Sequence, residues 1–263
     1  MPVILITGAS SGIGRAAAVE LGRRGHRVYG ASRTVGGAGP WVRMDVDDET
    51  SVAAAVAEVV GREGRLDGVV NAAGFGIAGA VEDTSLEEAR AQFETNFFGV
   101  LRVCRSVLPV FRGQGSGIIV NIGSIAGRVS LPFQGFYAAS KFALEGLTEA
   151  LRMEVRPFGV RVVLVEPGDF ATGFTDRRRT VAAAAAGPYR ERFARALSAI
   201  ERDERSAATP EAVGRVVAEI VSRPGPRLRY TVGPALQRLT PTLKALLPGR
   251  VFERLIADHY DAR

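Results

Sequence analysis

The chain has 263 residues, of which 46% are hydrophobic and 24% charged, and these values are close to the averages of globular proteins. This composition excludes a disordered or fibrous chain and fits one large α/β domain. The formal net charge of +6 raises the question of nucleic-acid binding. The arginines are spread along the chain among acidic residues, however, so we expect no nucleic-acid partner.

The one cysteine, Cys104, excludes an internal disulfide. No apolar run reaches the roughly 18 residues that a membrane-spanning helix needs, so we expect no integral membrane segment. The apolar residues Val3 to Ile6 run directly into a glycine motif, which indicates a strand and not a signal peptide. We therefore expect a cytoplasmic protein.

Short apolar segments alternate with longer helix-like stretches along the whole chain. Most of the short segments are rich in Val, Ile and Leu without alternation, which is typical of parallel strands covered on both faces. Ser85 and Glu88 have the spacing of a capping box at a helix start. The pattern predicts one Rossmann-type domain over residues 1–263, a doubly wound parallel sheet of about seven strands with helices on both faces. The predicted strands are Val3–Thr7, Arg27–Ala31, Trp41–Asp45, Gly68–Asn71, Ile118–Ile122, Arg161–Glu166 and Leu228–Val232.

A glycine-rich turn follows the first predicted strand. Glycines between a strand and a helix let the backbone approach a pyrophosphate, which the free amides of the helix N-terminus then hold. The predicted contacts in this turn are Gly8, Ser10, Ser11, Gly12, Ile13 and Gly14.

The end of the second predicted strand indicates which dinucleotide binds. NAD-binding units usually have an acid there for the ribose 2′-hydroxyl, whereas a 2′-phosphate favours arginine. This chain has Ser32 and Arg33 instead of an acid. Because a guanidinium can bind a phosphate through two parallel hydrogen bonds, we predict NADP(H) as the cofactor.

Tyr137 and Lys141 lie four residues apart, on one face of a predicted helix. A neighbouring ammonium favours the phenolate, so we expect Lys141 to lower the pKa of Tyr137 and to make it a general acid/base. Only two of the 34 basic side chains are lysines, which suggests that Lys141 has a role that arginine cannot fill. Ser124 follows the strand at Ile118–Ile122, where its hydroxyl could bond a substrate oxygen. His26 and His259 have no neighbours at metal-ligand spacing, so we expect no metal site.

Four motifs in order resemble those of the short-chain dehydrogenase/reductase family: Thr7 to Gly14, Asn71-Ala72-Ala73-Gly74, Tyr137 to Lys141, and Pro167-Gly168 with Phe170 and Thr172. The resemblance implies a catalytic set of Asn96, Ser124, Tyr137 and Lys141, with Asn96 supporting a proton relay. It also implies that Tyr137 and Lys141 contact the cofactor, that Asp45 and Val46 contact its adenine, and that Asn71, Ala72, Ala73 and Gly74 contact its ribose side. Pro167, Gly168, Phe170 and Thr172 would hold the nicotinamide end. Family members commonly form homodimers or homotetramers, here through helices at about 85–112 and 137–158.

The segment around Tyr137 is similar to the branch with 17β-hydroxysteroid and retinol dehydrogenases, which implies a bulky, apolar alcohol or ketone as substrate. Two alternatives remain: a 3-oxoacyl or polyketide-type ketoreductase, and a non-catalytic NADP(H) sensor on the same fold. We expect a substrate lid at about 172–209. The predicted substrate contacts are Ser124, Phe133, Phe136, Tyr137 and Phe174.

The C-terminal extension at about 234–263 has an apolar stripe at helical spacing, interrupted at Pro248-Gly249. Three roles are open for it. It could pack over the substrate crevice, join a subunit interface, or touch a membrane surface, in that order of preference.

Overall fold

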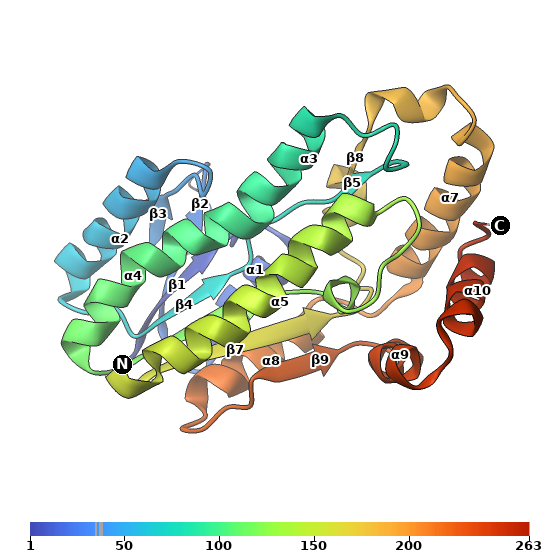
Figure 1. The fold of residues 1–263 in the computed structure, drawn as a ribbon. Helices are drawn as coiled ribbons and strands as arrows, with labels where there is room; N and C mark the ends of the chain where they lie inside the picture. The colour runs from blue at the N-terminus through green and yellow to red at the C-terminus, as the bar shows by residue number, and fades with distance from the viewer. Residues whose placement is uncertain (35, 37–38, 263) are drawn as a thin grey trace.

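A computed structural model describes residues 1–34, 36 and 39–262. Within these residues a central parallel sheet lies between two layers of helices (Figure 1). Its strands run in the order β3-β2-β1-β4-β6-β7-β9. Their bounds are β1 Val3–Thr7, β2 Arg27–Ser32, β3 Trp41–Arg43, β4 Gly68–Asn71, β6 Gly117–Ile122, β7 Val160–Pro167 and β9 Arg229–Val232.

The predicted single α/β fold and its seven strands are confirmed, with small differences at the strand ends. The third strand stops at Arg43, so Asp45 lies in the loop that follows it. β7 is one residue longer at each end than predicted. A second, two-stranded sheet of β5 (Ile77–Ala78) and β8 (Arg179–Thr180) was not predicted, because two residue pairs leave no periodicity in the sequence.

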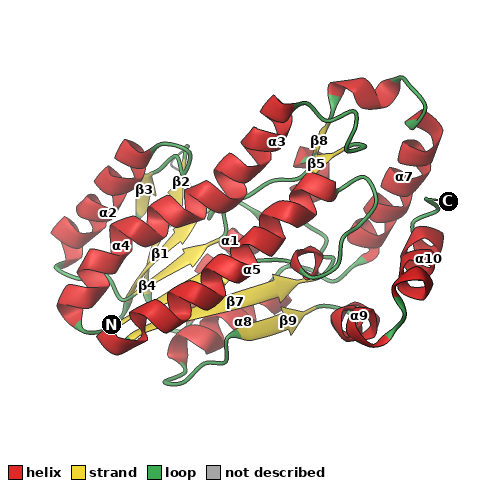
Figure 2. Cartoon of the chain, in the orientation of Figure 1, coloured by secondary structure: helices red, strands yellow, loops and turns green. Residues whose placement is uncertain are grey.

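Apolar side chains on the two faces of the sheet form two separate cores. One core joins the sheet to α2, α4 and α5, and the other joins it to α1 and α8. Figure 2 shows this helix–sheet–helix layering. The helices are α1 Gly12–Arg23, α2 Glu49–Glu63, α3 Leu86–Phe93, α4 Val100–Gln114, α5 Gly135–Val155, α6 Phe174–Arg177, α7 Arg190–Ser206, α8 Glu211–Ser222, α9 Ala235–Leu246 and α10 Gly249–His259.

Local signals in the sequence set several of these helix ends. The capping box predicted at Ser85 and Glu88 is confirmed at the start of α3. Gly64 and Gly115 end α2 and α4 in the left-handed conformation, which glycine adopts without a steric penalty. Between α3 and α4 the chain forms a π-helix over Glu94–Gly99, and this wider turn carries Asn96.

The segment predicted as a lid contains α6, β8 and α7, and the C-terminal extension contains α9 and α10. In Figure 1 both lie beyond the ends of β7 and β9. None of the helices formed by the described residues is long and apolar enough to cross a membrane.

Candidate active site

A cavity of about 1170 Å³ opens at the carboxyl ends of the central strands. Loops that follow β1, β4, β6 and β7 contribute to its wall. Ligands of doubly wound sheets bind in this position, at the carboxyl ends of the strands. The volume exceeds that of most single-ligand pockets, so a dinucleotide and a substrate have room side by side.

The glycine turn forms one end of this cavity. Gly8 and Gly12 have φ values of +65° and +53°, which favour glycine. A Cβ on Gly14 would overlap the carbonyl oxygen of Gly8, so only glycine lets the helix start approach the turn this closely. All six residues predicted to hold the pyrophosphate line the cavity: Gly8, Ser10, Ser11, Gly12, Ile13 and Gly14. The turn therefore fits a dinucleotide phosphate at the N-terminus of α1.

The hydroxyl of Thr7 connects this turn to the next strand. It accepts hydrogen bonds of 3.1 Å from the backbone amides of both Ala72 and Ala73. Ala72, Ala73 and Gly74 line the cavity, as do Ser32, Arg33, Asp45 and Val46 at the predicted adenine end. Arg33 is exposed, so its guanidinium is free to meet a phosphate there.

Two predicted site residues lie behind the cavity wall. Asn71 is buried and donates a 2.9 Å hydrogen bond to the side chain of Asn121. Asn96 is buried in the π-helix, where its amide bonds both the N–H and the carbonyl of Phe75, at 3.1 and 3.0 Å. Among the described residues that line the cavity, neither side chain is present. Asn96 thus holds the loop that carries Gly74 and Phe75, while Asn71 links β4 to β6.

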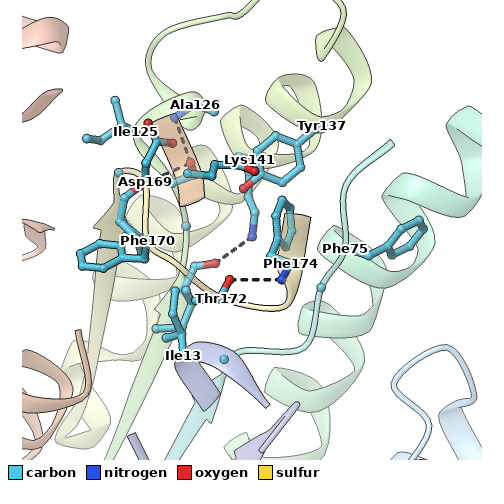
Figure 3. A pocket seen from close by; sticks show the side chains of 18 of the residues that line it. Ile13, Phe75, Ile125, Ala126, Tyr137, Lys141, Asp169, Phe170, Thr172 and Phe174 are labelled. Carbon is cyan, nitrogen blue, oxygen red and sulfur yellow. Dashed lines mark hydrogen bonds between the residues drawn. The ribbon is translucent and has the colours of Figure 1, made fainter. Parts of the chain in front are cut away.

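Ser124, Tyr137 and Lys141 all line the cavity. The ammonium of Lys141 lies 5.9 Å from the centre of the Tyr137 ring, and the Ser124 hydroxyl is near enough to act to lower the pKa of the phenol. Figure 3 shows Tyr137 and Lys141 on the same side as the ring of Phe174, whose centre is 5.6 Å from that of Tyr137. The cavity thus brings together three of the four predicted catalytic residues.

Burial decides the pKa values of this pair. It raises the pKa of Tyr137 to about 12, against the opposing effect of the Ser124 hydrogen bond. It also lowers the pKa of Lys141 to about 8. The pKa of Tyr137 is therefore raised and not lowered as expected, because burial of the phenol itself is the largest influence on it. The phenol stays protonated at neutral pH.

An acidic cluster not foreseen in the sequence lines the cavity beyond Tyr137. Asp169 accepts a hydrogen bond from the side-chain amide of Gln237, and burial raises its pKa to about 6. Glu204 pairs with Arg178 and accepts a 2.7 Å hydrogen bond from Thr175. The carboxylates of Glu204 and Asp169 also act to raise the pKa of Tyr137. Asp169 belongs to a recognised motif, but Gln237 and Glu204 do not. The grouping of these side chains could therefore be seen only once the lid and the tail were folded.

The nicotinamide-end motif has all four of its predicted contacts, Pro167, Gly168, Phe170 and Thr172, on the cavity wall. Thr172 accepts a 3.2 Å hydrogen bond from the amide of Phe174, at the start of α6 (Figure 3). A Cβ on Gly12 would lie 3.7 Å from the Cβ of Thr172, so this motif and the glycine turn lie next to each other on the cavity wall.

Of the three phenylalanines predicted to contact the substrate, one lines the cavity and two lie elsewhere. Phe174 lines the cavity beside Tyr137. Phe133 does not: with φ at +60° it turns toward the lid and packs on Phe193 at 5.6 Å between ring centres. Phe136 is also missing from the described residues of the cavity wall. Proximity to Tyr137 in the sequence was misleading here, because successive residues at a helix start point in different directions.

The C-terminal helices supply cavity residues that the sequence could not assign. Packing over the crevice was the first of the three roles considered for the extension, and Leu236 of α9 and Phe252 of α10 do line the cavity. Among the described residues, no three His, Cys, Asp or Glu side chains are grouped as metal ligands.

The fold, the glycine turn and the Ser–Tyr–Lys set together define a nicotinamide-dependent oxidoreductase scaffold. The family profile described as short chain dehydrogenase matches residues 2–182, and the chain belongs to this family.

Three known proteins show how far the similarity extends. The 3-ketodihydrosphingosine reductase of Bacteroides thetaiotaomicron is 44% identical over 99% of this chain and 98% of its own length. Human 17-beta-hydroxysteroid dehydrogenase type 1 is 34% identical over 93% of this chain and 80% of its own. The crystal structure of a short chain dehydrogenase/reductase from Burkholderia phymatum in complex with NAD matches with a TM-score of 0.80 and 29% identity, covering 93% of this chain and 94% of that one. The chain is therefore an oxidoreductase of the short-chain dehydrogenase type.

Proposed function

We propose that the protein is an NADP(H)-dependent reductase of a long-chain, lipid-like ketone, with Tyr137 as the proton donor. The single observation that carries this proposal is that the glycine turn and the hydroxyl groups of Ser124 and Tyr137 line one continuous cavity. The bound cofactor would supply the hydride to the carbonyl carbon.

The residues of this chain would do the rest of the work. Ser124 would hold the carbonyl oxygen by a hydrogen bond, and Tyr137 would give that oxygen its proton. A phenol with a pKa of about 12 is a much stronger acid than an aliphatic alcohol, so this transfer is downhill once the oxygen gains charge. Lys141 would bind the cofactor and add positive charge near the phenol.

The choice of NADP(H) over NAD(H) is supported by Ser32 and Arg33 on the cavity wall, where an acid would repel a 2′-phosphate. Three features make the glycine turn suitable for binding the cofactor phosphates. Gly8 has a positive φ, Gly14 lies close to the carbonyl of Gly8, and the turn leads into the N-terminus of α1.

The apolar lining favours a lipid-like substrate. Beyond Tyr137 the lid and the tail contribute many apolar side chains to the wall, and Leu131 of the loop before α5 joins them: Phe174, Ile200, Leu236, Leu243, Phe252, Leu255 and Ile256. The reductase from Bacteroides, which is named for a long-chain sphingoid ketone, supports the same class. The acidic cluster around Asp169 would suit a substrate with a nearby ammonium group.

The decisive experiment measures NADPH and NADH oxidation with 3-ketodihydrosphingosine, steroid ketones, retinal and 3-oxoacyl thioesters. We expect NADPH-dependent turnover of the long-chain ketone that Tyr137→Phe reduces at least about 1000-fold. Tyr189→Phe is the matched control, because Tyr189 is outside the described cavity wall and its hydroxyl donates a hydrogen bond to Glu82.

The alternatives give different results in the same experiment. Preferred reduction of 3-oxoacyl thioesters would make the protein an acyl-type ketoreductase. Tight NADPH binding without turnover of any ketone would make it a sensor.

We also propose a homo-oligomer, dimer or tetramer. Exposed apolar side chains on α3, on the π-helix before α4, on α5 and in the turn after α5 support it: Leu86, Phe98, Phe142, Met153 and Phe158. Light scattering after size-exclusion chromatography would measure the mass directly.

A further inference from the structure

Helix α9 presents an apolar face to solvent. Leu236, Leu239, Leu243 and Leu246 are spaced three, four and three residues apart, so they lie on one side of the helix. All four are exposed, and Leu246 is the most exposed of them, at 76%. Pro241, on the opposite side, is buried. Four leucines on one open face form a patch that soluble proteins normally cover.

Helix α10 extends this face. Val251 and Leu255 are exposed one turn apart, while their neighbour Phe252 is buried and lines the cavity. The two helices follow each other through the short connection at Leu247 and Pro248, and Figure 1 shows them together at the C-terminal end of the molecule.

The apolar face reaches the mouth of the substrate cavity. Leu236, Leu243 and Leu255 are each more than one-third exposed, and each also lines the cavity. They therefore form a rim on which the outer surface and the cavity lining meet. An apolar molecule could pass from this surface into the cavity without crossing a polar barrier at these three side chains.

Cations surround the apolar face. Helices α9 and α10 together carry four basic residues, Arg238, Lys244, Arg250 and Arg254, and two acids, Glu253 and Asp258. All six of these residues are exposed. An apolar stripe with basic residues beside it is the pattern of helices that lie in the interface of an anionic membrane.

The charges argue against a second copy of this chain as the occupant. A two-fold interface would place the same four cations of each protomer on one patch, with two acids on each side, so each protomer would bring a net positive charge. Like charges held together in this way oppose association. Anionic lipid headgroups would neutralise the same cations.

We propose that α9 and α10 form a membrane-docking surface that rests on an anionic lipid bilayer, with the mouth of the cavity facing the lipid. The exposed leucines would enter the headgroup boundary, and the arginines would contact lipid phosphates. No part of the chain needs to span the bilayer. The surface does not depend on reductase chemistry, so it can be tested without turnover.

The test is co-sedimentation of the full chain with phosphatidylcholine vesicles, with and without about one-third phosphatidylglycerol. We expect binding to the mixed vesicles at about 0.1 M salt, much weaker binding to pure phosphatidylcholine, and loss of most binding at about 1 M salt. Leu239→Gln combined with Leu246→Gln should weaken vesicle binding at least about tenfold. These two leucines are outside the described cavity wall, so turnover in detergent-free solution should be unchanged.

Two matched controls make the result specific. Leu86→Gln changes an equally exposed leucine at the start of α3 and should not alter vesicle binding. Arg250→Gln with Arg254→Gln should weaken binding to the mixed vesicles about tenfold, whereas Arg23→Gln with Arg62→Gln, on α1 and α2, should not.

Failure of the wild-type protein to bind mixed vesicles would overturn the proposal, and so would equal binding by the double leucine variant. Conversion of an oligomer to a monomer by that variant, without vesicle binding by the wild type, would identify the face as a contact between copies instead.

Discussion

The ammonium of Lys141 donates a 2.9 Å hydrogen bond to the backbone oxygen of Ile122, at the end of β6. This is the one hydrogen bond found for the ammonium among the described residues, and the side chain is only 7% exposed. Burial of this charged group lowers the free energy of unfolding, because the ammonium loses most of its hydration. The same burial places the ammonium beside Tyr137 in the active site.

Lys141→Met is therefore expected to stabilise the cofactor-free protein at pH 7 while it removes reductase activity. The folded pKa of about 8 lies below the ordinary 10.5, so the unfavourable contribution is complete below pH 8 and disappears as the pH rises to 10.5. The gap corresponds to about 3 kcal/mol. Urea unfolding at pH 7 and pH 10 should show a gain for the variant at pH 7 that shrinks at pH 10.

Lys244→Met is the matched control, since it replaces the other lysine of the chain at an exposed position. It should change the free energy of unfolding by less than about 1 kcal/mol at either pH. A Lys141→Met variant that is less stable than wild type at pH 7 would contradict the burial argument.

Asp169→Asn should shift the pH dependence of alcohol oxidation to lower pH. Oxidation needs the phenolate of Tyr137, and the Asp169 carboxylate helps to raise the pKa of that phenol. Because the pKa of Asp169 is itself raised to about 6, its negative charge is present above pH 6 and lost below it. Initial rates of oxidation between pH 6 and 10 measure the shift, which we expect to be below about one pH unit.

Asp176→Asn is the control for this shift, because Asp176 is exposed on the lid and pairs with Arg205. An unchanged profile for Asp169→Asn would show that this carboxylate does not influence the phenol in the working enzyme.

Arg33→Ser should lower kcat/KM for NADPH about 10- to 100-fold and leave kcat/KM for NADH nearly unchanged, because one charged hydrogen-bonding partner of a 2′-phosphate is lost. Arg43→Ser, at the end of β3, removes an exposed arginine outside the described cavity wall and should have little effect on either cofactor. Equal losses for both cofactors in Arg33→Ser would refute the predicted preference.

Two glycine substitutions in α1 should act in opposite directions. Gly14→Ala places a methyl group against the carbonyl of Gly8, so we expect it to reduce cofactor affinity at least about tenfold and to lower stability. Gly22→Ala meets no atom within 4 Å and should raise the free energy of unfolding by about 0.5–1 kcal/mol. Calorimetry of NADPH binding and thermal unfolding of both variants provide the comparison.

Features with a local or periodic signal could be predicted from the sequence. The apolar runs located all seven strands of the main sheet to within two residues at either end. The glycine turn, Ser124, Tyr137 and Lys141 were expected near one another and all line the cavity. These features depend on backbone geometry that is fixed within a few residues of the motif.

Features that depend on how distant segments pack could not be predicted. Asp169 meets Gln237 only because α9 folds back over the crevice, 68 residues further along the chain. The raised pKa of Tyr137 results from burial and from the carboxylates of Glu204 and Asp169, which its sequence neighbours did not indicate. Phe133 was misplaced because its positive φ turns the loop away from the cavity.

The π-helix over Glu94–Gly99 lets this part of the chain absorb a change of length. A π-turn holds one residue more than an α-turn, so deletion of the exposed Phe98 would let the wide turn close to an α-helical turn. Val103, Val107 and Phe111 of α4 would then keep their places in the core. Deletion of one residue in the regular part of α4 would instead turn the rest of that helix by about 100° and should damage folding far more.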